Sequence, residues 1–215
     1  MSRSLLQSRA DPLWAKACRA YVLQADLEEA CRYQLVAVQQ QLARTSREIY
    51  VCPAASLHVT VAILLHVRRG YSTTKDELWR HYGEAWCRGL GELATALEPF
   101  VINFEALVVN SDAVIALAPP VPAIEQFRQR ANELLAESGL ESFQPSIVHC
   151  TLLHFSQTGL DLTPMHHAAK AVALEASSSI AEVTVAQESI YPSLVRRRIA
   201  RLVLGRRPTE STRRS

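Results

Sequence analysis

Two short stretches, one in each half of the chain, place apolar and polar residues in the same order. Residues 56–61 read SLHVTV and residues 147–152 read IVHCTL, and each stretch continues as an apolar run. Side chains two apart on a strand share a face, so each His points the same way as its Thr. Val59 and Cys150 then point into a core. The pattern predicts two buried strands, about 56–66 and 146–155, each with one polar face.

Apolar residues at helical spacing surround both of these strands. The predicted helices run over about 27–44, from Thr74 to Leu97, from Pro122 to Gly139 and over 162–176. Asp26 with Glu29, and Thr74 with Glu77, have the spacing of a capping box. Pro122 stands where the first residue of a helix would, and Gly139 is a natural helix end.

Shorter apolar runs between the helices predict further strands. They cover Tyr21–Gln24, Ile49–Cys52, Phe100–Asn110, Ala113–Ala118, Ile180–Ser189 and Ile199–Leu204. The turn 110–112 would join two of them as a strand pair. Strand, helix and motif strand follow one another in each half, which indicates a degenerate repeat with a pseudo-two-fold axis. The sequence thus predicts an α+β protein in which two mainly antiparallel sheets form a groove.

The size and charge of the chain fit a single globular domain. The chain has 215 residues, which suits one domain or two lobes that share an interior. We expect an arm over 1–18, the domain over 19–205 and a basic, disordered tail over 206–215. The net charge of +2 argues against a protein that coats DNA, although it permits a local basic patch.

Cysteine usage and hydropathy predict a cytoplasmic protein. The five cysteines are scattered without a Cys-x-x-Cys pair, which fits reduced thiols. The first 16 residues lack the continuous apolar stretch of a signal peptide. The longest apolar run, near 59–65, is too short to span a bilayer, so no membrane association is expected.

The two polar strand faces carry residues suited to acid-base chemistry. If the lobes face each other, His58 and Thr60 stand opposite His149 and Thr151. One imidazole can take a proton while the other gives one, because histidine titrates near neutral pH. The Thr hydroxyls can donate to phosphoryl oxygens. Such a set suits displacement at phosphorus without a metal or other cofactor.

The paired motifs His58-Val59-Thr60 and His149-Cys150-Thr151 resemble those of the two-histidine (2H) phosphoesterases. This family includes the LigT-like RNA 2′,3′-cyclic phosphodiesterases, which are also called 2′-5′ RNA ligases. The resemblance covers most of residues 20–205 and implies the bilobal LigT-like fold. It implies that an RNA or nucleotide 2′,3′-cyclic phosphate is opened to a 2′-phosphate. By the same analogy, His58 is the acid for the leaving oxygen and His149 the base for water.

Substrate contacts outside the motifs are expected near the last strand. Tyr191 could stack on a base, or could equally be a packed tyrosine at a strand end. Arg196 and Arg198 share one strand face and could bind RNA phosphates, although a solvated face is the alternative. His66 and His154 follow the motif strands at different offsets and are expected to be structural or rim residues. We expect a monomer with no metal site.

Two functional alternatives remain open from the sequence. A 2H enzyme could act instead on 2′-5′ linkages or on ADP-ribose cyclic phosphate. The chain could also be a nucleotide- or RNA-binding module that hydrolyses nothing. If both His-x-Thr pairs were accidents, the protein would be a general α+β interaction domain.

Overall fold

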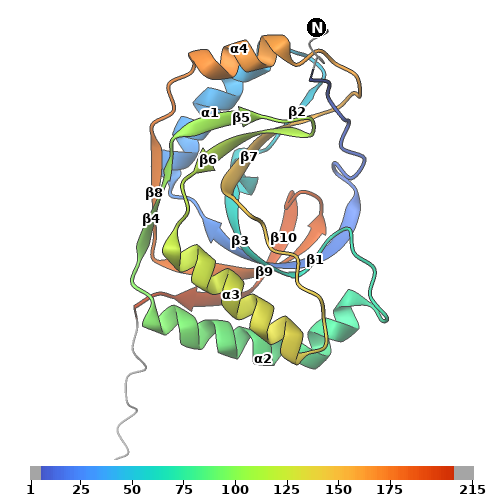
Figure 1. Ribbon diagram of the computed structural model, residues 1–215, viewed down its shortest axis with the longest axis vertical. Helices are drawn as coiled ribbons and strands as arrows, with labels where there is room; N and C mark the ends of the chain where they lie inside the picture. Colours follow the sequence, from blue (N-terminus) through green and yellow to red (C-terminus); the bar gives the residue numbers. More distant parts are fainter. Residues whose placement is uncertain (1–5, 206–215) are drawn as a thin grey trace, which may run out of the picture.

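The computed structural model describes residues 6–205, which form a layered α+β structure (Figure 1). The helices are α1 (Glu29–Ala43), α2 (Lys75–Ala96), α3 (Pro122–Glu137) and α4 (Thr163–Ala171). The strands are β1 (Ala17–Asp26), β2 (Ile49–Val51), β3 (His58–Leu65), β4 (Phe100–Phe104), β5 (Ala106–Val109), β6 (Ala113–Ala118), β7 (Val148–Phe155), β8 (Ala176–Ile180), β9 (Glu182–Ile190) and β10 (Val195–Val203).

Two four-stranded antiparallel sheets make up the centre of the molecule. One has the order β10-β9-β1-β3 and the other β2-β7-β6-β5, while β4 and β8 form a separate pair. The motif strand β3 belongs to the first sheet and the motif strand β7 to the second, and the two strands contact each other. The predicted fold class, with two antiparallel sheets that each carry one motif, is confirmed.

The helices cover the outer faces of the sheets at opposite ends of the molecule. Helices α2 and α3 lie side by side at the end of the first sheet, and α1 and α4 lie at the end of the second (Figure 1). Helix α3 therefore packs on β3 and helix α1 on β7, although each is far from that strand in the sequence. This exchange places side chains of both halves of the chain behind each motif strand.

Several predicted elements are confirmed by the structure. Thr74 caps α2 through a complete capping box, in which its side chain accepts from the Glu77 N–H and the Glu77 carboxylate accepts from the Thr74 N–H. Pro122 opens α3 as predicted. Gly139, just past the end of α3, has a φ of +71°, a conformation that glycine adopts without a steric cost.

The capping box predicted at Asp26 is wrong. Helix α1 begins at Glu29 after Glu28, which makes no side-chain cap. Asp26 is instead the last residue of β1, and its carboxylate lies 2.6 Å from Arg196 Nη2. A distant guanidinium has displaced the local helix cap as the partner of this carboxylate.

Two predicted boundaries in the middle and late chain are also wrong. The expected strand Phe100–Asn110 is two strands, because β4 pairs with β8 and β5 pairs with β6. The helix predicted over 162–176 ends at Ala171, and Ala176 begins the unpredicted strand β8. Its sequence ASSSI is too polar to show the apolar pattern of a strand.

The chain ahead of β1 packs against the second sheet. The ring of Trp14 stacks on Tyr50 of β2 at a centroid distance of 4.8 Å, and Gln7 bridges to Asp161.

The predicted division into arm, domain and tail stays a prediction, and residues 1–5 and the predicted tail 206–215 lie outside the described residues. No helix within 6–205 is long and apolar enough to cross a membrane.

Candidate active site

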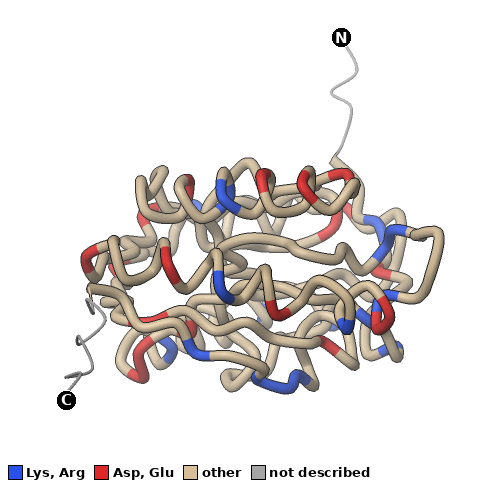
Figure 2. The backbone as a smooth tube through the Cα atoms, turned by 90° about the horizontal axis from the view of Figure 1, so that it is seen from below, with Lys and Arg blue, Asp and Glu red and all other residues tan. Residues whose placement is uncertain are grey.

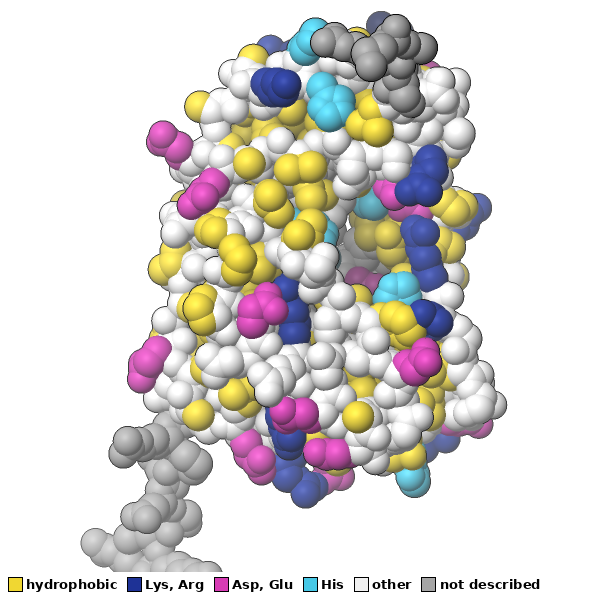
Figure 3. Space-filling view, in the orientation of Figure 1, with side chains coloured by type: hydrophobic (Ala, Val, Ile, Leu, Met, Phe, Trp, Pro, Cys, Tyr) yellow, Lys and Arg dark blue, Asp and Glu magenta, His cyan; other side chains and the backbone are white. Residues whose placement is uncertain are grey.

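A cavity of about 480 Å³ lies between the two sheets and contains both predicted motifs. Its walls include His58, Thr60, His149 and Thr151, together with Tyr191. Figure 3 shows the recess right of centre, with histidine side chains at its edge. The volume is in the range of pockets that hold a small organic ligand.

His58 is held in one orientation by the backbone two residues before it. Its Nδ1 lies 2.7 Å from the Ser56 carbonyl oxygen, so Nδ1–H donates there and Nε2 faces the other way. Thr60 Oγ1 lies 3.4 Å from that Nε2. Desolvation between the strands lowers the pKa of His58 to about 4, and the positive charges of Arg196 and His149 act in the same direction.

His149 has a parallel environment on the second strand. Desolvation lowers its pKa, a hydrogen bond with the Ile147 carbonyl raises it, and the charge of Arg128 lowers it again. Burial raises the pKa of the neighbouring Cys150 thiol, while a hydrogen bond with the His58 backbone opposes that shift. Strands β3 and β7 contact each other, and both histidines line the same cavity.

Each motif strand contains a β-bulge three residues after its histidine. Val61 is the extra residue in β3, because Thr60 and Ala62 pair with consecutive residues of β1. Leu152 is the extra residue in β7, where Thr151 and Leu153 pair with consecutive residues of β6. A bulge changes which face the following side chains occupy.

Buried helix side chains bind the carbonyls of both bulges. Arg128 of α3, 3% exposed, donates from Nε to the Val61 carbonyl at 3.2 Å and from Nη2 to the Ile147 carbonyl at 2.8 Å. Gln39 of α1, 1% exposed, donates to the carbonyls of Leu152 and Cys52, both at 2.8 Å. Each side chain therefore ties one bulge to the segment that leads into the other motif strand.

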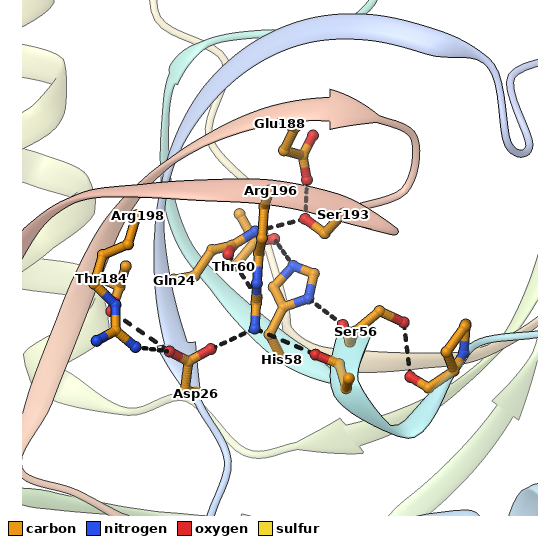
Figure 4. Close-up of polar contacts among 12 residues, drawn as sticks. Gln24, Asp26, Ser56, His58, Thr60, Thr184, Glu188, Ser193, Arg196 and Arg198 are labelled. Atoms are coloured by element: carbon orange, nitrogen blue, oxygen red, sulfur yellow. Dashed lines mark hydrogen bonds and ion pairs between the residues drawn. The ribbon is translucent and has the colours of Figure 1, made fainter.

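The predicted substrate-binding residues occupy different places. Tyr191 lines the cavity, and burial raises the pKa of its phenol to about 12. Arg196 is not among the cavity residues. Its guanidinium bonds to Gln24 Oε1 at 2.7 Å and to Asp26 at 2.6 Å, beside His58 (Figure 4). Arg198 lies 3.8 Å from Asp26 with a largely exposed side chain.

Known structures match the chain over most of its length. E. coli LigT in apo form matches with a TM-score of 0.59, 18% identity and coverage of 88% of this chain and 99% of LigT. TT0787 of Thermus thermophilus gives 0.64 and 20%, covering 87% and 98%. The MHV ns2 PDE domain gives 0.51 and 14%, covering 81% and 100%. The chain has the LigT-like fold. No family model and no curated protein sequence match it.

The LigT-like fold confirms, at the level of architecture, the resemblance drawn from the two motifs. Its sheets bring His58, Thr60, His149, Thr151 and Tyr191 to one cavity. The acid-base and substrate roles of these residues stay predictions, because identities of 20% or less establish the architecture and not the chemistry.

Sequence reasoning did not assign three polar residues at the far end of this cavity to the site. Asp11, Arg68 and His154 all line it. Strict alternation from His149 would place His154 on the opposite face, and the bulge at Leu152 reverses that. Asp11 lies in the segment ahead of β1, where no periodic pattern marked it. A bulge leaves no sequence signal that alternation alone could detect.

No group of three or more His, Cys, Asp or Glu side chains within 6–205 is arranged to hold a metal ion. The polar groups of the two motifs themselves are imidazoles and hydroxyls. Such groups can move protons and donate hydrogen bonds to an anion. Figure 2 shows that basic and acidic residues are interspersed along the backbone in the view from below.

Proposed function

We propose that the protein is a metal-independent cyclic phosphodiesterase that opens nucleotide or RNA 2′,3′-cyclic phosphates to 2′-phosphates. The observation that carries this proposal is the convergence of His58, Thr60, His149 and Thr151 on one cavity. Two imidazoles and two hydroxyls around one point match the needs of displacement at phosphorus, which are one base, one acid and donors to the equatorial oxygens.

The two histidines divide the proton transfers. One imidazole removes a proton from water as it attacks phosphorus, and the other gives a proton to the departing ribose oxygen. The Ser56 carbonyl fixes His58 so that Nε2 is the atom available for transfer. Thr60 and Thr151 donate to the non-bridging oxygens. The analogy with LigT makes His58 the acid and His149 the base, which stays a prediction.

The nucleotide part of the proposal draws on LigT. Crystal structures of E. coli LigT are known in complex with 3′-AMP, with ATP, with NADP+ and with phosphate. The chain here shares the fold of LigT, and the aromatic residue Tyr191 lies on the wall of its cavity. A nucleotide with its phosphate at the histidines is therefore the ligand class we propose.

Binding without hydrolysis is the second candidate function, and one observation favours it. Desolvation lowers the pKa of His58 to about 4 and lowers the pKa of His149 from its ordinary value, and both shifts favour the neutral rings. A neutral ring whose Nδ1–H is bonded to a backbone carbonyl has no proton on Nε2, so it supplies no acid. An enzyme would then need the anionic substrate to raise one of these pKa values.

A panel of nucleoside 2′,3′-cyclic phosphates, assayed with excess chelator, separates these functions. The proposal expects 2′-phosphate products and an unchanged rate after chelation. Products with a 3′-phosphate, or activity that is lost on chelation and restored by a divalent ion, would contradict it. Tight binding of the same compounds by calorimetry without any product would favour the binding module.

A further inference from the structure

A third histidine, His154, shares the cavity with the two motif histidines. It lies five residues after His149, and the bulge at Leu152 turns it to the same side of β7. Five residues of a strand span at most about 16 Å. The residue with the same offset in the other motif strand is Ile63, which also lines the cavity. The two ends of the cavity therefore differ in chemistry.

His154 is buried and only partly satisfied. Its residue is 6% exposed, and its Nδ1 lies 2.9 Å from Asp11 Oδ2 without meeting hydrogen-bond geometry. Its Nε2 has no contact of this kind and no hydrogen-bond partner among residues 6–205. A buried polar atom without a partner costs about 1–3 kcal/mol, so native proteins rarely keep one without a use.

Asp11 is held rigidly in this position. Its Oδ1 accepts the Leu13 N–H at 3.0 Å and lies 3.5 Å from Arg68. Although burial acts to raise its pKa, His154, the Leu13 N–H and Arg68 together hold that pKa below the usual value. The carboxylate oxygens are therefore already occupied, and the unpartnered Nε2 of His154 is the group left to meet a ligand.

Aromatic surface stands next to this atom. The Tyr191 ring is edge-on to His154 with centroids 6.2 Å apart, and the Arg68 guanidinium lies 5.9 Å from the centre of the same tyrosine ring. Flat aromatic and guanidinium groups of this kind are the surfaces on which proteins stack nucleobases. The hydrogen-bonding atom and the stacking surface thus occur together.

The charge at this end of the cavity disfavours a second phosphate. Arg68 lies 3.5 Å from Asp11, and Arg9 pairs with Asp112 at 2.8 Å, so these four charges balance. A second anionic group would find no unpaired cation among these four residues, whereas the uncharged part of a nucleotide needs none.

We propose that His154, positioned by Asp11, contacts the nucleobase of the substrate, and that Tyr191 supplies the surface beside it. This inference rests on the proposed function, since it assumes that the phosphate lies at His58 and His149. With Asp11 on the Nδ1 side, His154 is left with Nε2 to form a hydrogen bond with the edge of the base.

Two substitutions at one position separate a ligand contact from a structural role. His154→Asn keeps a donor near Asp11 but loses the group at the Nε2 position, and His154→Gln keeps a polar group near the Nε2 position but loses the Nδ1 contact. KM and kcat are measured for nucleoside 2′,3′-cyclic phosphates and for methyl riboside 2′,3′-cyclic phosphate, which has no base. Melting temperatures show whether each variant folds.

We expect His154→Asn to raise KM about tenfold for the nucleoside substrates, the loss of one hydrogen bond, with kcat unchanged. His154→Gln should stay within about threefold of the wild type, and the base-free substrate should not distinguish the three proteins. An unchanged KM in His154→Asn, or an equal loss on the base-free substrate, would overturn the inference.

The outcome for the proposed function is read separately. If the wild type turns over neither substrate, that function fails, and calorimetry with nucleoside 2′-phosphates then tests the base contact. A tenfold weaker affinity of His154→Asn, restored in His154→Gln, would support the contact even so. Equal affinities of all three proteins would overturn it.

Discussion

The two motif strands are built alike and differ in what supports them. Strands β3 and β7 each carry His-x-Thr, each bulge three residues after the histidine, and each give the bulge carbonyl to a buried helix side chain from the other half of the chain. Behind β3 that side chain is the charged Arg128, and behind β7 it is the neutral Gln39. The repeat has kept the geometry of the site and varied its electrostatics.

The charges of nearby arginines matter because they shift the pKa values of the two histidines. Arg128 lowers the pKa of His149, while Arg196 lowers that of His58 from the opposite side. The pKa of each imidazole ring is thus lowered by a different arginine. Acid-base catalysis needs two rings of unlike protonation, and unequal surroundings favour such a state.

The largest effect should come from the histidines themselves. We expect His58→Ala and His149→Ala each to lower kcat/KM on a nucleoside 2′,3′-cyclic phosphate by at least ~10²-fold, the low end for a positioned acid or base. The double variant should be little worse than the worse single one, because the two rings act as a unit.

His167→Ala on the exposed face of α4 is the matched control, and it should leave kcat/KM unchanged. Circular dichroism confirms that each variant is folded. If only one of the two histidines mattered, the functional equivalence of β3 and β7 would be lost and the two-histidine mechanism with it.

The second test concerns Arg128 and Gln39, the two helix side chains that donate to the bulge carbonyls. Arg128→Met leaves the Val61 and Ile147 carbonyls without this donor, which we expect to lower the free energy of unfolding by about 2–4 kcal/mol. Gln39→Met should cost less, about 1–2 kcal/mol, since the Leu152 carbonyl still accepts from the Cys52 N–H at 3.0 Å.

Urea unfolding of both variants gives these free energies directly. The order matters more than the values, because both substitutions keep a long side chain in the core. A Gln39→Met variant less stable than Arg128→Met would mean that the neutral support, and not the charged one, is the stronger tie between the halves.

The sequence predicted the elements of the site better than its connections. Alternation identified both motif strands, and the Thr74 capping box located the start of α2, because these signals are local. The Asp26 capping box failed because a long-range partner, Arg196, competes for the same carboxylate. Local patterns hold where no distant group offers a stronger interaction.

The bulges at Val61 and Leu152 mark the limit of that reasoning. Both lie inside continuous apolar runs, where an extra residue changes no periodicity that a reader of the sequence could see. Arg128 likewise looks like a surface residue of an amphipathic helix until the fold places it, 3% exposed, behind β3. The offset of His154 predicts a structural or rim residue, and the bulge at Leu152 turns its side chain toward the cavity.

The third test separates the two arginines by pH. Removing a positive charge raises the pKa of a nearby histidine, so Arg128→Met should move the limb of the kcat/KM profile that belongs to His149 to higher pH. Arg196→Met should move the His58 limb upward from about pH 4. If both variants moved the same limb, the separate control of the two rings would be refuted.

The smallest effect should come from Arg198 of the edge strand β10. Its guanidinium is largely exposed and 3.8 Å from Asp26, and exposed ion pairs contribute about 0.2–1 kcal/mol. We expect Arg198→Ala to change kcat/KM on a mononucleotide by about twofold or less, because Arg196 already holds Asp26 at 2.6 Å.

The informative comparison uses an RNA that ends in a 2′,3′-cyclic phosphate. If Arg198 binds the RNA backbone, the variant should lose the salt dependence that distinguishes the RNA from the mononucleotide. If the salt dependence of the two proteins is the same, the predicted substrate role of Arg198 is wrong and β10 presents a solvated face.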